Sequence, residues 1–480
     1  MKNNKEASQS GQSEPIDPAL MKLVWVLLVG TLAPLFDTTI MNVSIDTLGQ
    51  SLNASVSSIH WVMTSYLLAF GIVVPITGWS VNRFGGKRMW IFALAVFLGG
   101  SILCSLSWNV GSLIVFRAIQ GIGGGLMLPI MQTLVVQASG NQKLGKLMTV
   151  VGLPALLGPI LGPVVGGLVI ENLNWRWVFY VNIPICIAAI ILARWGLSDK
   201  SSTKHTQHLD VIGLALISPA LVLMIYGLSE VGIHHGFEHA SVLIPILIGV
   251  ILLAAFAIYV LQKAESPLLD LRLFKSRPFT ASSILLFLSG LSTYGAMLLL
   301  PMYYQQVRGE SVLASGLLLV PQGLGMLLTR SLAGKLTDQI GSRPVVLAGT
   351  LLTALGTLPF VLAGAHTSHI LLALALIVRG AGLGAVFLPI MASSYVGLSR
   401  EQIPDASSAT RLIQQIGGAF GASVLAVILQ NQLTSLSPTD LVAKAQAFDH
   451  TFLWSLGFTV VGLIPAALLP RNRSKAHSEA

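Results

Sequence analysis

The chain has 480 residues, of which 54% are hydrophobic and only 10% are charged. A soluble globular domain carries about 25% charged residues, so this composition excludes an ordinary hydrated surface and predicts a protein whose solvent is a membrane. The formal net charge of +9 would suit nucleic acid, but the basic residues are spread among the loops of a membrane protein. The two cysteines, Cys104 and Cys186, stand singly in apolar stretches and predict neither a disulfide framework nor a metal site.

Apolar stretches of about twenty residues recur along the whole chain, and each is long enough to cross a bilayer as a helix. We count fourteen of them, over residues 22–45, 57–80, 89–107, 111–136, 147–170, 177–196, 209–229, 241–261, 279–304, 312–333, 344–364, 368–396, 407–430 and 451–470. The predicted fold is therefore an all-α integral membrane protein. The pair at 209–229 and 241–261 could also form a long hairpin.

The basic residues test this count. Of the 28 Lys and Arg residues, 23 fall in segments that lie on the side of the N-terminus, three in the opposite loops, and two, Arg117 and Arg379, within predicted helices. Arg330 and Arg411 are counted among the 23. Such an asymmetry is the positive-inside pattern, and it predicts that both termini are cytoplasmic in a bacterial inner or plasma membrane. The positive charge would then face anionic lipid headgroups rather than nucleic acid.

Two segments of the chain repeat after roughly 260 residues. The first repeat contributes Gly78, Asn82, Arg83, Gly85, Lys87 and Arg88, and the second contributes Gly334, Asp338, Gly341 and Arg343. Leu-Pro-Ile-Met at 128–131 recurs at 388–391. The displacement predicts two six-helix bundles, at 22–196 and 279–470, with a two-helix insertion and its linkers at 197–278 and tails at 1–21 and 471–480. Repeats of this kind place a substrate site between the two halves.

These motifs resemble the major facilitator superfamily, and within it the fourteen-helix drug:proton antiporters of the EmrB/QacA type, from about residue 22 to 470. The loop signature stands at 78–88 and again at 334–343. Residues 113–123 are similar to the fourth-helix motif, 37–43 to the first-helix motif of the fourteen-helix branch, and 175–184 to another segment typical of it. The fifth-helix motif associated with antiporters is matched by Gly152, Gly158, Pro159, Gly162, Pro163 and Gly166. The resemblance implies the major facilitator fold and export driven by protons.

One position departs from the family pattern. The first loop motif usually has Asp where this chain has Asn82. The resemblance implies that this acid caps a neighbouring helix end, an interaction worth about 0.3–1 kcal/mol through the helix dipole. We therefore expect a weaker latch in the first half, with Asp338 taking more of that role in the second half.

Asp37 is the residue around which we expect the mechanism to be built. About fourteen apolar residues precede it in the first helix, so its carboxyl lies deep in the hydrocarbon, where it costs about 2.5–3.5 kcal/mol. A low-dielectric cavity favours the protonated acid, and a cationic substrate arriving nearby would favour the ionised form and expel the proton. That competition is antiport. The alternative is a carboxylate held in a structural hydrogen-bond network.

Two arginines could couple this acid to conformation. Arg117 lies in the fourth predicted helix, close enough to reach a cavity lined by the first helix, and Arg379 holds a comparable position in the twelfth. Their alternative roles are snorkelling to the interface or pairing with backbone carbonyls. The fifth helix has a face of small residues and two prolines, which predict a kinked helix that can slide against its neighbour in the other half and act as a gate. The alternative is ordinary close packing without gating.

Polar and aromatic side chains on the predicted helices are candidates for lining the cavity, although each could equally be a packing group. They are Asn42, Tyr66, Gln120, Gln132, Tyr294, Tyr304, Gln322, Gln414 and Gln415, with Met127 and Met131 adding adaptable apolar surface. A wide apolar pocket with few polar groups suits lipophilic substrates, cationic ones included, better than sugars or phosphates.

No motif supplies an enzyme activity or a cofactor. His235-Gly-Phe-Glu-His239 matches a zinc-protease pattern but falls in a short outer loop, and the glycine run at 121–125 lacks the lysine of a phosphate loop. Energy must come from a gradient, and a single deep acid favours protons over sodium. The leading hypothesis is a proton-coupled multidrug efflux antiporter. A dedicated exporter of one metabolite, lipid or siderophore, a non-transporting receptor and a channel stay open, and no feature identifies a periplasmic adaptor.

Overall fold

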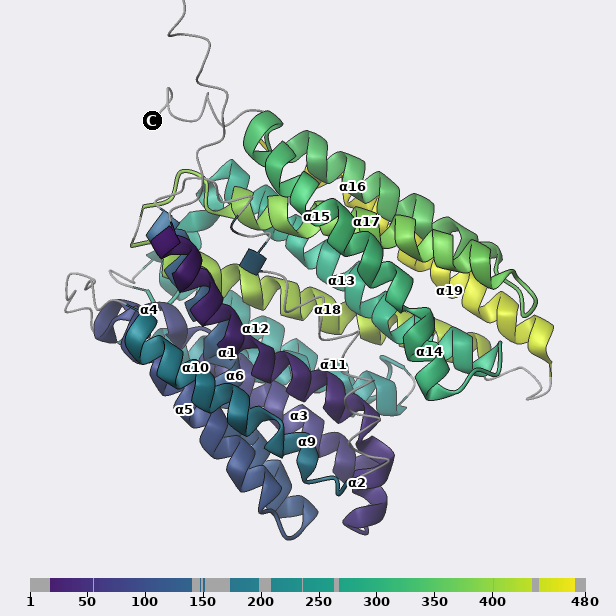
Figure 1. Ribbon diagram of the computed structural model, residues 1–480, viewed down its shortest axis with the longest axis horizontal. Coiled ribbons are helices and arrows are strands. Elements are labelled where there is room, and N and C mark those ends of the chain that lie inside the picture. The colour runs from purple at the N-terminus through teal and green to yellow at the C-terminus, as the bar shows by residue number, and fades with distance from the viewer. Residues whose placement is uncertain are drawn as a thin grey trace, which may run out of the picture.

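The computed structural model describes residues 18–54, 56–139, 147, 150–151, 173–197, 209–234, 236–262, 267–399, 401–433 and 440–470. Within these ranges the chain forms helices and no strands. We call α1 to α10 the first half and η1 to α20 the second half, with α11 and α12 between them. Figure 1 shows the two halves as separate groups of long helices lying side by side.

The first half contains the polar network described below. Its helices are α1 (Pro18–Val43), α2 (Ile45–Ser51), α3 (Val56–Val73), α4 (Ile76–Phe84), α5 (Gly86–Ser105), α6 (Val110–Ser139), α9 (Trp177–Tyr180) and α10 (Asn182–Gly196). Here α6 packs between α3 and α5, while α10 packs against α1 and α5. The helices α1, α3, α5, α6 and α10 therefore pack together, and side chains on their facing sides can meet.

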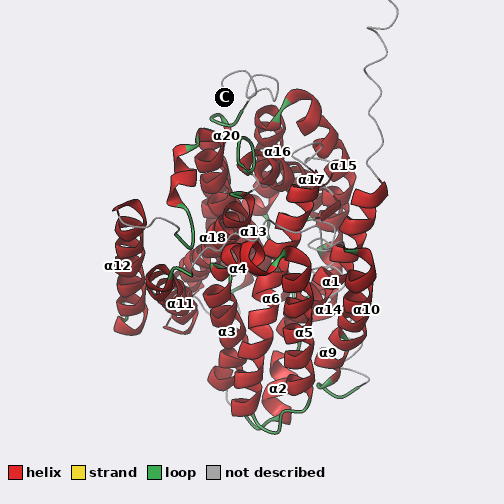
Figure 2. Cartoon of the chain, turned by 90° about the vertical axis from the view of Figure 1, so that its left-hand side faces the viewer, coloured by secondary structure: helices red, strands yellow, loops and turns green. Residues whose placement is uncertain are grey.

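The second half repeats much of this arrangement. Its elements are η1 (Leu271–Lys275), α13 (Arg277–Gln306), α14 (Val312–Leu318), α15 (Val320–Ile340), α16 (Ser342–Thr357), η2 (Leu358–Leu362), α17 (His369–Ser394), α18 (Ile403–Leu433), α19 (Leu441–Val461) and α20 (Leu463–Ala466). As α6 does in the first half, α17 packs between two helices, α15 and α16. The two intervening helices, α11 (Val211–His234) and α12 (Ala240–Gln262), form a pair at one edge of the molecule (Figure 2).

In the described ranges, twelve helices are long and apolar enough to cross a membrane. α3 and α4 meet the same length and hydropathy criteria only when taken together, and they are bent by 56° relative to each other, so they form either one broken span or a re-entrant loop. The bend falls at Pro75, whose ring removes a backbone donor. Apart from residues 147 and 150–151, the predicted helix at 147–170 lies outside the described residues, and the helices that are described do not reach the expected total of fourteen. The paired helices at 211–234 and 240–262 are each long enough to span.

Several predicted boundaries were wrong. The last crossing begins at Leu441 rather than at 451, because the Asp440 side chain accepts a hydrogen bond of 2.9 Å from the Ala443 amide and caps the helix there. The predicted helix at 312–333 is divided into α14 and α15, and α15 continues to Ile340. α2 was not predicted. These errors concern helix ends, which apolar stretches define poorly.

Glycines bring the helices of the first half close enough for polar side chains to meet. A methyl group on Gly100 of α5 would overlap the backbone of Gln120, and one on Gly124 of α6 would overlap the hydroxyl of Tyr66. Small residues at such crossings allow close backbone approach in membrane helices. Two of the side chains placed in this way, Gln120 and Tyr66, belong to the site described below.

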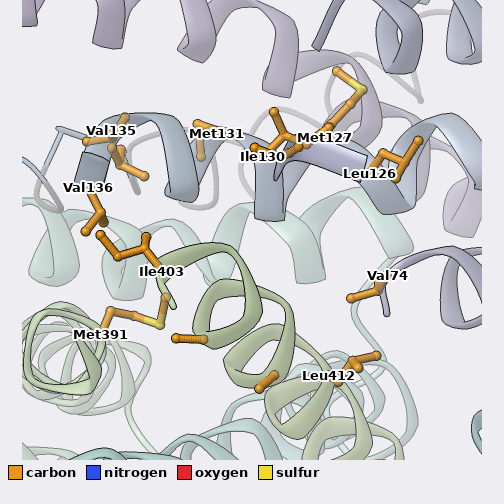
Figure 3. Close-up of a cluster of buried hydrophobic side chains, with 14 of the residues drawn as sticks. Val74, Leu126, Met127, Ile130, Met131, Val135, Val136, Met391, Ile403 and Leu412 are labelled. Carbon is orange, nitrogen blue, oxygen red and sulfur yellow. The ribbon is translucent and has the colours of Figure 1, made fainter. Parts of the chain in front are cut away.

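The two halves are joined by buried apolar side chains at one end of the molecule. This end carries Arg83, Lys87 and Arg88 at the turn from α4 to α5 and Lys335 and Arg343 at the turn from α15 to α16, and we call it the basic face. A single buried cluster there includes Met131 and Val136 of α6, Met391 of α17 and Ile403 and Leu412 of α18 (Figure 3). Contacts between the halves run mainly through α18, which packs against α4 and α6.

At the other end the buried apolar clusters do not cross between the halves. One of them, which includes Ile40, Val62 and Phe179, belongs to the first half. Another, which includes Tyr303, Tyr304 and Phe448, belongs to the second half. Among the residues described, the apolar contact between the halves lies at the basic face, so in this conformation the two halves are packed together there.

Candidate functional site

The carboxylate of Asp37 is completely buried inside the first half and accepts three hydrogen bonds. Arg117 Nη1 of α6 donates to Oδ2 at 2.5 Å. Gln120 Nε2, also of α6, donates to Oδ1 at 2.8 Å, and Asn182 Nδ2 of α10 donates to the same oxygen at 3.0 Å. A buried carboxylate needs both a counter-charge and donors, and this site supplies both.

Arg117 and Gln120 extend this network to further helices. Arg117 Nη1 also donates to Gln120 Oε1 at 2.7 Å, its Nε donates to the Val62 carbonyl of α3 at 3.4 Å, and its guanidinium lies 4.4 Å from the centroid of the Tyr66 ring. Gln120 Nε2 donates to the Ser101 hydroxyl of α5 at 2.9 Å. The network therefore joins α1, α3, α5, α6 and α10.

The burial of Asp37 limits how it can act. In this conformation its side chain has no exposed surface, and three protein donors occupy its two oxygens. In this conformation a substrate therefore cannot contact the carboxylate directly. Adding a proton would instead neutralise the acid and weaken its hold on Arg117, which also contacts α3. Any influence on a substrate would pass through Arg117 and Tyr66.

The second half repeats the arginine but not the acid. Arg379 of α17 is buried, and its guanidinium donates to Gln322 Oε1 at 2.6 Å, to the Thr357 hydroxyl at 3.3 Å and to the Ser292 carbonyl at 3.4 Å. In the described part of the chain these partners are all uncharged. The two halves thus share a helical framework but differ in electrostatics, because Arg117 pairs with an acid and the described partners of Arg379 are neutral.

The repeated loop motif has the same backbone geometry in both halves. Gly85 and Gly341, the last glycines of the two motifs, have φ values of 87° and 88°. With ψ near 145° and 168°, both occupy a region that is essentially restricted to glycine. The sequence repeat is therefore also a structural repeat at the basic face.

The first glycine of the motif in the first half is a contact point between the halves. A methyl group on Gly78 of α4 would overlap the Asp405 carboxylate of α18 and crowd its backbone. Asp405 lies in the first turn of α18, and the N-terminus of α4 has no side-chain cap of its own. Asn82, one turn after Gly78, is half-buried and Arg83 is exposed; Asp338 of α15 is half-buried in the second half.

The candidate cavity residues do not gather in one place. Tyr66 and Gln120 lie at the Asp37 network, Gln322 contacts Arg379, and Gln414 contacts Arg411. Met127 and Met131 belong to the apolar cluster at the basic face, and Tyr304 lies in the cluster of the second half. Gln132 is buried, Gln415 is half-buried, and Tyr294 lies close to Gly418. The side chain of Asn42 is outside the described part.

The predicted gate of the fifth helix cannot be placed. Its residues Gly152, Gly158, Pro159, Gly162, Pro163 and Gly166 all lie outside the described residues, as does His235 of the zinc-protease pattern. No group of three or more His, Cys, Asp or Glu side chains that could hold a metal ion occurs among the residues that are described.

Sequence reasoning missed four residues that the structure makes prominent. Asn182 and Ser101 complete the network around Asp37, and a polar residue in each apolar stretch was the available signal. Arg411 was counted with the cytoplasmic charges, but α18 begins at Ile403, so Arg411 lies well inside a helix that contacts the first half. Arg330, counted in the same way, is buried in α15.

Comparisons with known proteins agree with this fold. Residues 27–422 match the Major Facilitator Superfamily. A "Multidrug resistance protein B homolog" of Mycobacterium tuberculosis is 31% identical over 98% of this chain and 93% of its own length. The "Multidrug transporter protein MdtP" of Bacillus subtilis is 29% identical over 98% of this chain and 86% of its own length.

A solved structure shows the same architecture. The human organic anion transporter MFSD10 has a TM-score of 0.63 at 18% identity, covering 94% of this chain and all of that chain. At this level of identity the likeness concerns the fold. The helices that could span a membrane, the repeated loop motif and the family match lead to one conclusion. This chain is a multi-pass membrane protein of the Major Facilitator Superfamily, and it is a transporter of small molecules rather than an enzyme.

Proposed function

We propose that this transporter is a proton-coupled multidrug efflux antiporter that exports lipophilic compounds by alternating access between its two halves. The observation that carries the proposal is the buried Asp37–Arg117 ion pair, present in the first half and without a counterpart acid at Arg379. Intramembrane acids are costly, and in transporters they commonly mark proton pathways. The names of the multidrug-resistance relatives support export of drugs as the cargo class.

A proton bound at Asp37 has a structural route to the contact between the halves. Neutralising Asp37 would weaken its pairing with Arg117, whose guanidinium also touches α3 at Val62 and Tyr66. α3 leads through the bend at Pro75 into α4, where Gly78 meets Asp405 of α18. Movement of α3 would therefore be transmitted to the contact that closes the basic face, which is how protonation and opening become linked.

The topology follows from the same proposal. We place the basic face in the cytoplasm, with both termini on that side, because it carries the Lys and Arg residues of the repeated loops. We also assign the chain to the fourteen-helix drug:proton antiporters. In that assignment α3 with α4 forms one bent crossing, and the apolar segment at 147–170 forms the remaining one. Site-directed labelling of single cysteines at the helix ends would test both assignments.

The decisive experiment is transport in proteoliposomes with an imposed pH gradient and several lipophilic dyes. Wild-type protein should accumulate the dyes only when the gradient is present. Asp37→Asn should bind dyes but lose the response to the gradient, because its amide does not titrate. Arg272→Gln, an exposed change in η1, is the matched control and should behave as wild type. Wild-type uptake that ignores the gradient, or an Asp37→Asn protein that responds normally, would refute proton coupling at this residue.

A further inference from the structure

A second arginine lies where the two halves meet. Arg411 stands eight residues after the start of α18, about 12 Å along the helix axis from the basic face. Its guanidinium carbon lies 5.7 Å from the centroid of the Phe70 ring of α3, and its charge also acts on Tyr66 one turn earlier. The side chain is half-buried. Arg411 therefore projects from the second half toward the first, near the network of Asp37.

The contacts of Arg411 leave its charge uncompensated. Nη1 donates to Gln414 Oε1 at 3.2 Å, on the same helix, and Nε is buried without an acceptor. Among the described residues no carboxylate lies within ion-pair distance of it, whereas Arg117 is paired with Asp37. A cation held in a low-dielectric region with a neutral acceptor and an aromatic face is only partly satisfied.

The surrounding charges add to this imbalance. Asp37 is already neutralised by Arg117, and the partners of Arg379 are uncharged. Asp405, six residues before Arg411, lies against Gly78 nearer the basic face. At the contact between the halves, Arg411 thus carries a buried donor without an acceptor among the described residues. In a poorly screened region a cationic cargo would be repelled there, and an anionic group would be attracted.

We propose that Arg411, Gln414 and Phe70 form a subsite for an anionic group on an otherwise lipophilic aromatic cargo. A carboxylate, sulfonate or phenolate would accept hydrogen bonds from the guanidinium fork, including its unpaired Nε–H. The aromatic part of the cargo would pack against Phe70. This inference rests on the proposed export function and narrows its cargo to lipophilic compounds that carry an anionic group, whereas the sequence alone also allowed cationic ones.

Two dyes with nearly the same aromatic skeleton test the subsite. 8-Anilinonaphthalene-1-sulfonate is anionic, and N-phenyl-1-naphthylamine is neutral. Binding is measured by fluorescence titration of protein in nanodiscs, with empty nanodiscs subtracted. Arg411→Gln should weaken binding of the anionic dye about tenfold, the loss expected for a hydrogen-bonded charge partner, and leave binding of the neutral dye within about twofold. Arg411→Lys, which keeps the charge but loses the fork, should weaken the anionic dye by a smaller factor. Arg272→Gln is the control and should change neither.

The outcomes separate this inference from the proposed function. If wild-type protein transports the neutral dye under a pH gradient but Arg411→Gln affects both dyes equally or neither, the subsite is wrong and the export function stands. If wild type neither binds nor transports either dye, both are overturned. Should Arg411→Gln fail to fold, Arg411→Lys still decides, because equal effects on the two dyes would rule out recognition of the anionic group.

Discussion

Arg117 and Asp37, eighty residues apart in the chain, form an ion pair at 2.5 Å that is sealed inside the first half of the transporter. Neither side chain is more than 2% exposed, and the pair is held by donors and acceptors from neighbouring helices. Its burial means that each partner depends on the other, since an unpaired charge in such a place is strongly destabilising. The same pair is the origin of our first two predictions.

Removing one partner of the pair should destabilise the protein more than removing both. Arg117→Gln alone leaves a buried carboxylate and should cost about 3–5 kcal/mol in the free energy of unfolding, unless the acid takes up a proton. The double variant Asp37→Asn with Arg117→Gln leaves two neutral amides and should recover most of that loss. Thermal unfolding in detergent measures both. Additive losses would show that the two side chains are not coupled.

The two buried arginines should differ in their effect on proton coupling. Arg117→Gln should abolish the dependence of dye uptake on the pH gradient, because it removes the counter-charge of Asp37. Arg379→Gln removes hydrogen bonds to Gln322, Thr357 and Ser292 only, so uptake should fall while its dependence on the gradient is kept. The measured quantity is the ratio of initial uptake with and without the gradient. An Arg379→Gln protein that ignores the gradient would contradict this asymmetry.

The contact between Gly78 and Asp405 should control closure of the basic face. Gly78→Ala introduces a methyl group where the Asp405 carboxylate lies, so α4 and α18 should separate. A cysteine at Val136, which lies close to Ile403 in Figure 3, reports this opening through its rate of alkylation. We expect labelling to be several-fold faster with Gly78→Ala. Gly99→Ala in α5, where no atom lies within 4 Å of the added group, is the matched control.

An acid at position 82 of α4 should be able to replace the acid at position 405 of α18. Asp405 places a carboxylate beside the uncapped start of α4, whereas relatives with the usual loop motif carry the acid where this chain has Asn82. Asp405→Asn should therefore weaken closure by about two- to fivefold in the labelling rate, the equivalent of 0.3–1 kcal/mol from a helix dipole. Adding Asn82→Asp to that variant should restore slow labelling. If the double variant labels as fast as Asp405→Asn, the acid at position 82 does not act as a latch.

Hydropathy predicted the helical architecture well, since long apolar stretches have few alternatives in a membrane. The sequence singled out Asp37 and Arg117, because a charge within an apolar stretch is unusual, and it named Gln120 only as one of several candidates for lining a cavity. It could not show that Asn182 completes the site, because a single polar residue in an apolar helix does not reveal which way it points.

Other features depend on contacts between distant residues. Arg411 looks like a charge at a helix end until the start of α18 is fixed four residues earlier than hydropathy suggests. The asymmetry between Arg117 and Arg379 is likewise invisible in the repeat, because it depends on what each arginine meets in space. The complete burial of Asp37 in this conformation is also invisible in the sequence, because it depends on the helices that surround it.

The apolar cluster that joins the halves at the basic face has a consequence for temperature. When that face opens, side chains such as Met131, Met391 and Leu412 must become hydrated. Apolar association in water weakens on cooling, whereas a polar contact such as that at Asp405 does not follow the same trend. Cold should therefore shift the resting population of this transporter toward the state that is open at the basic face, and the size of the shift measures how much of the contact between the halves is hydrophobic.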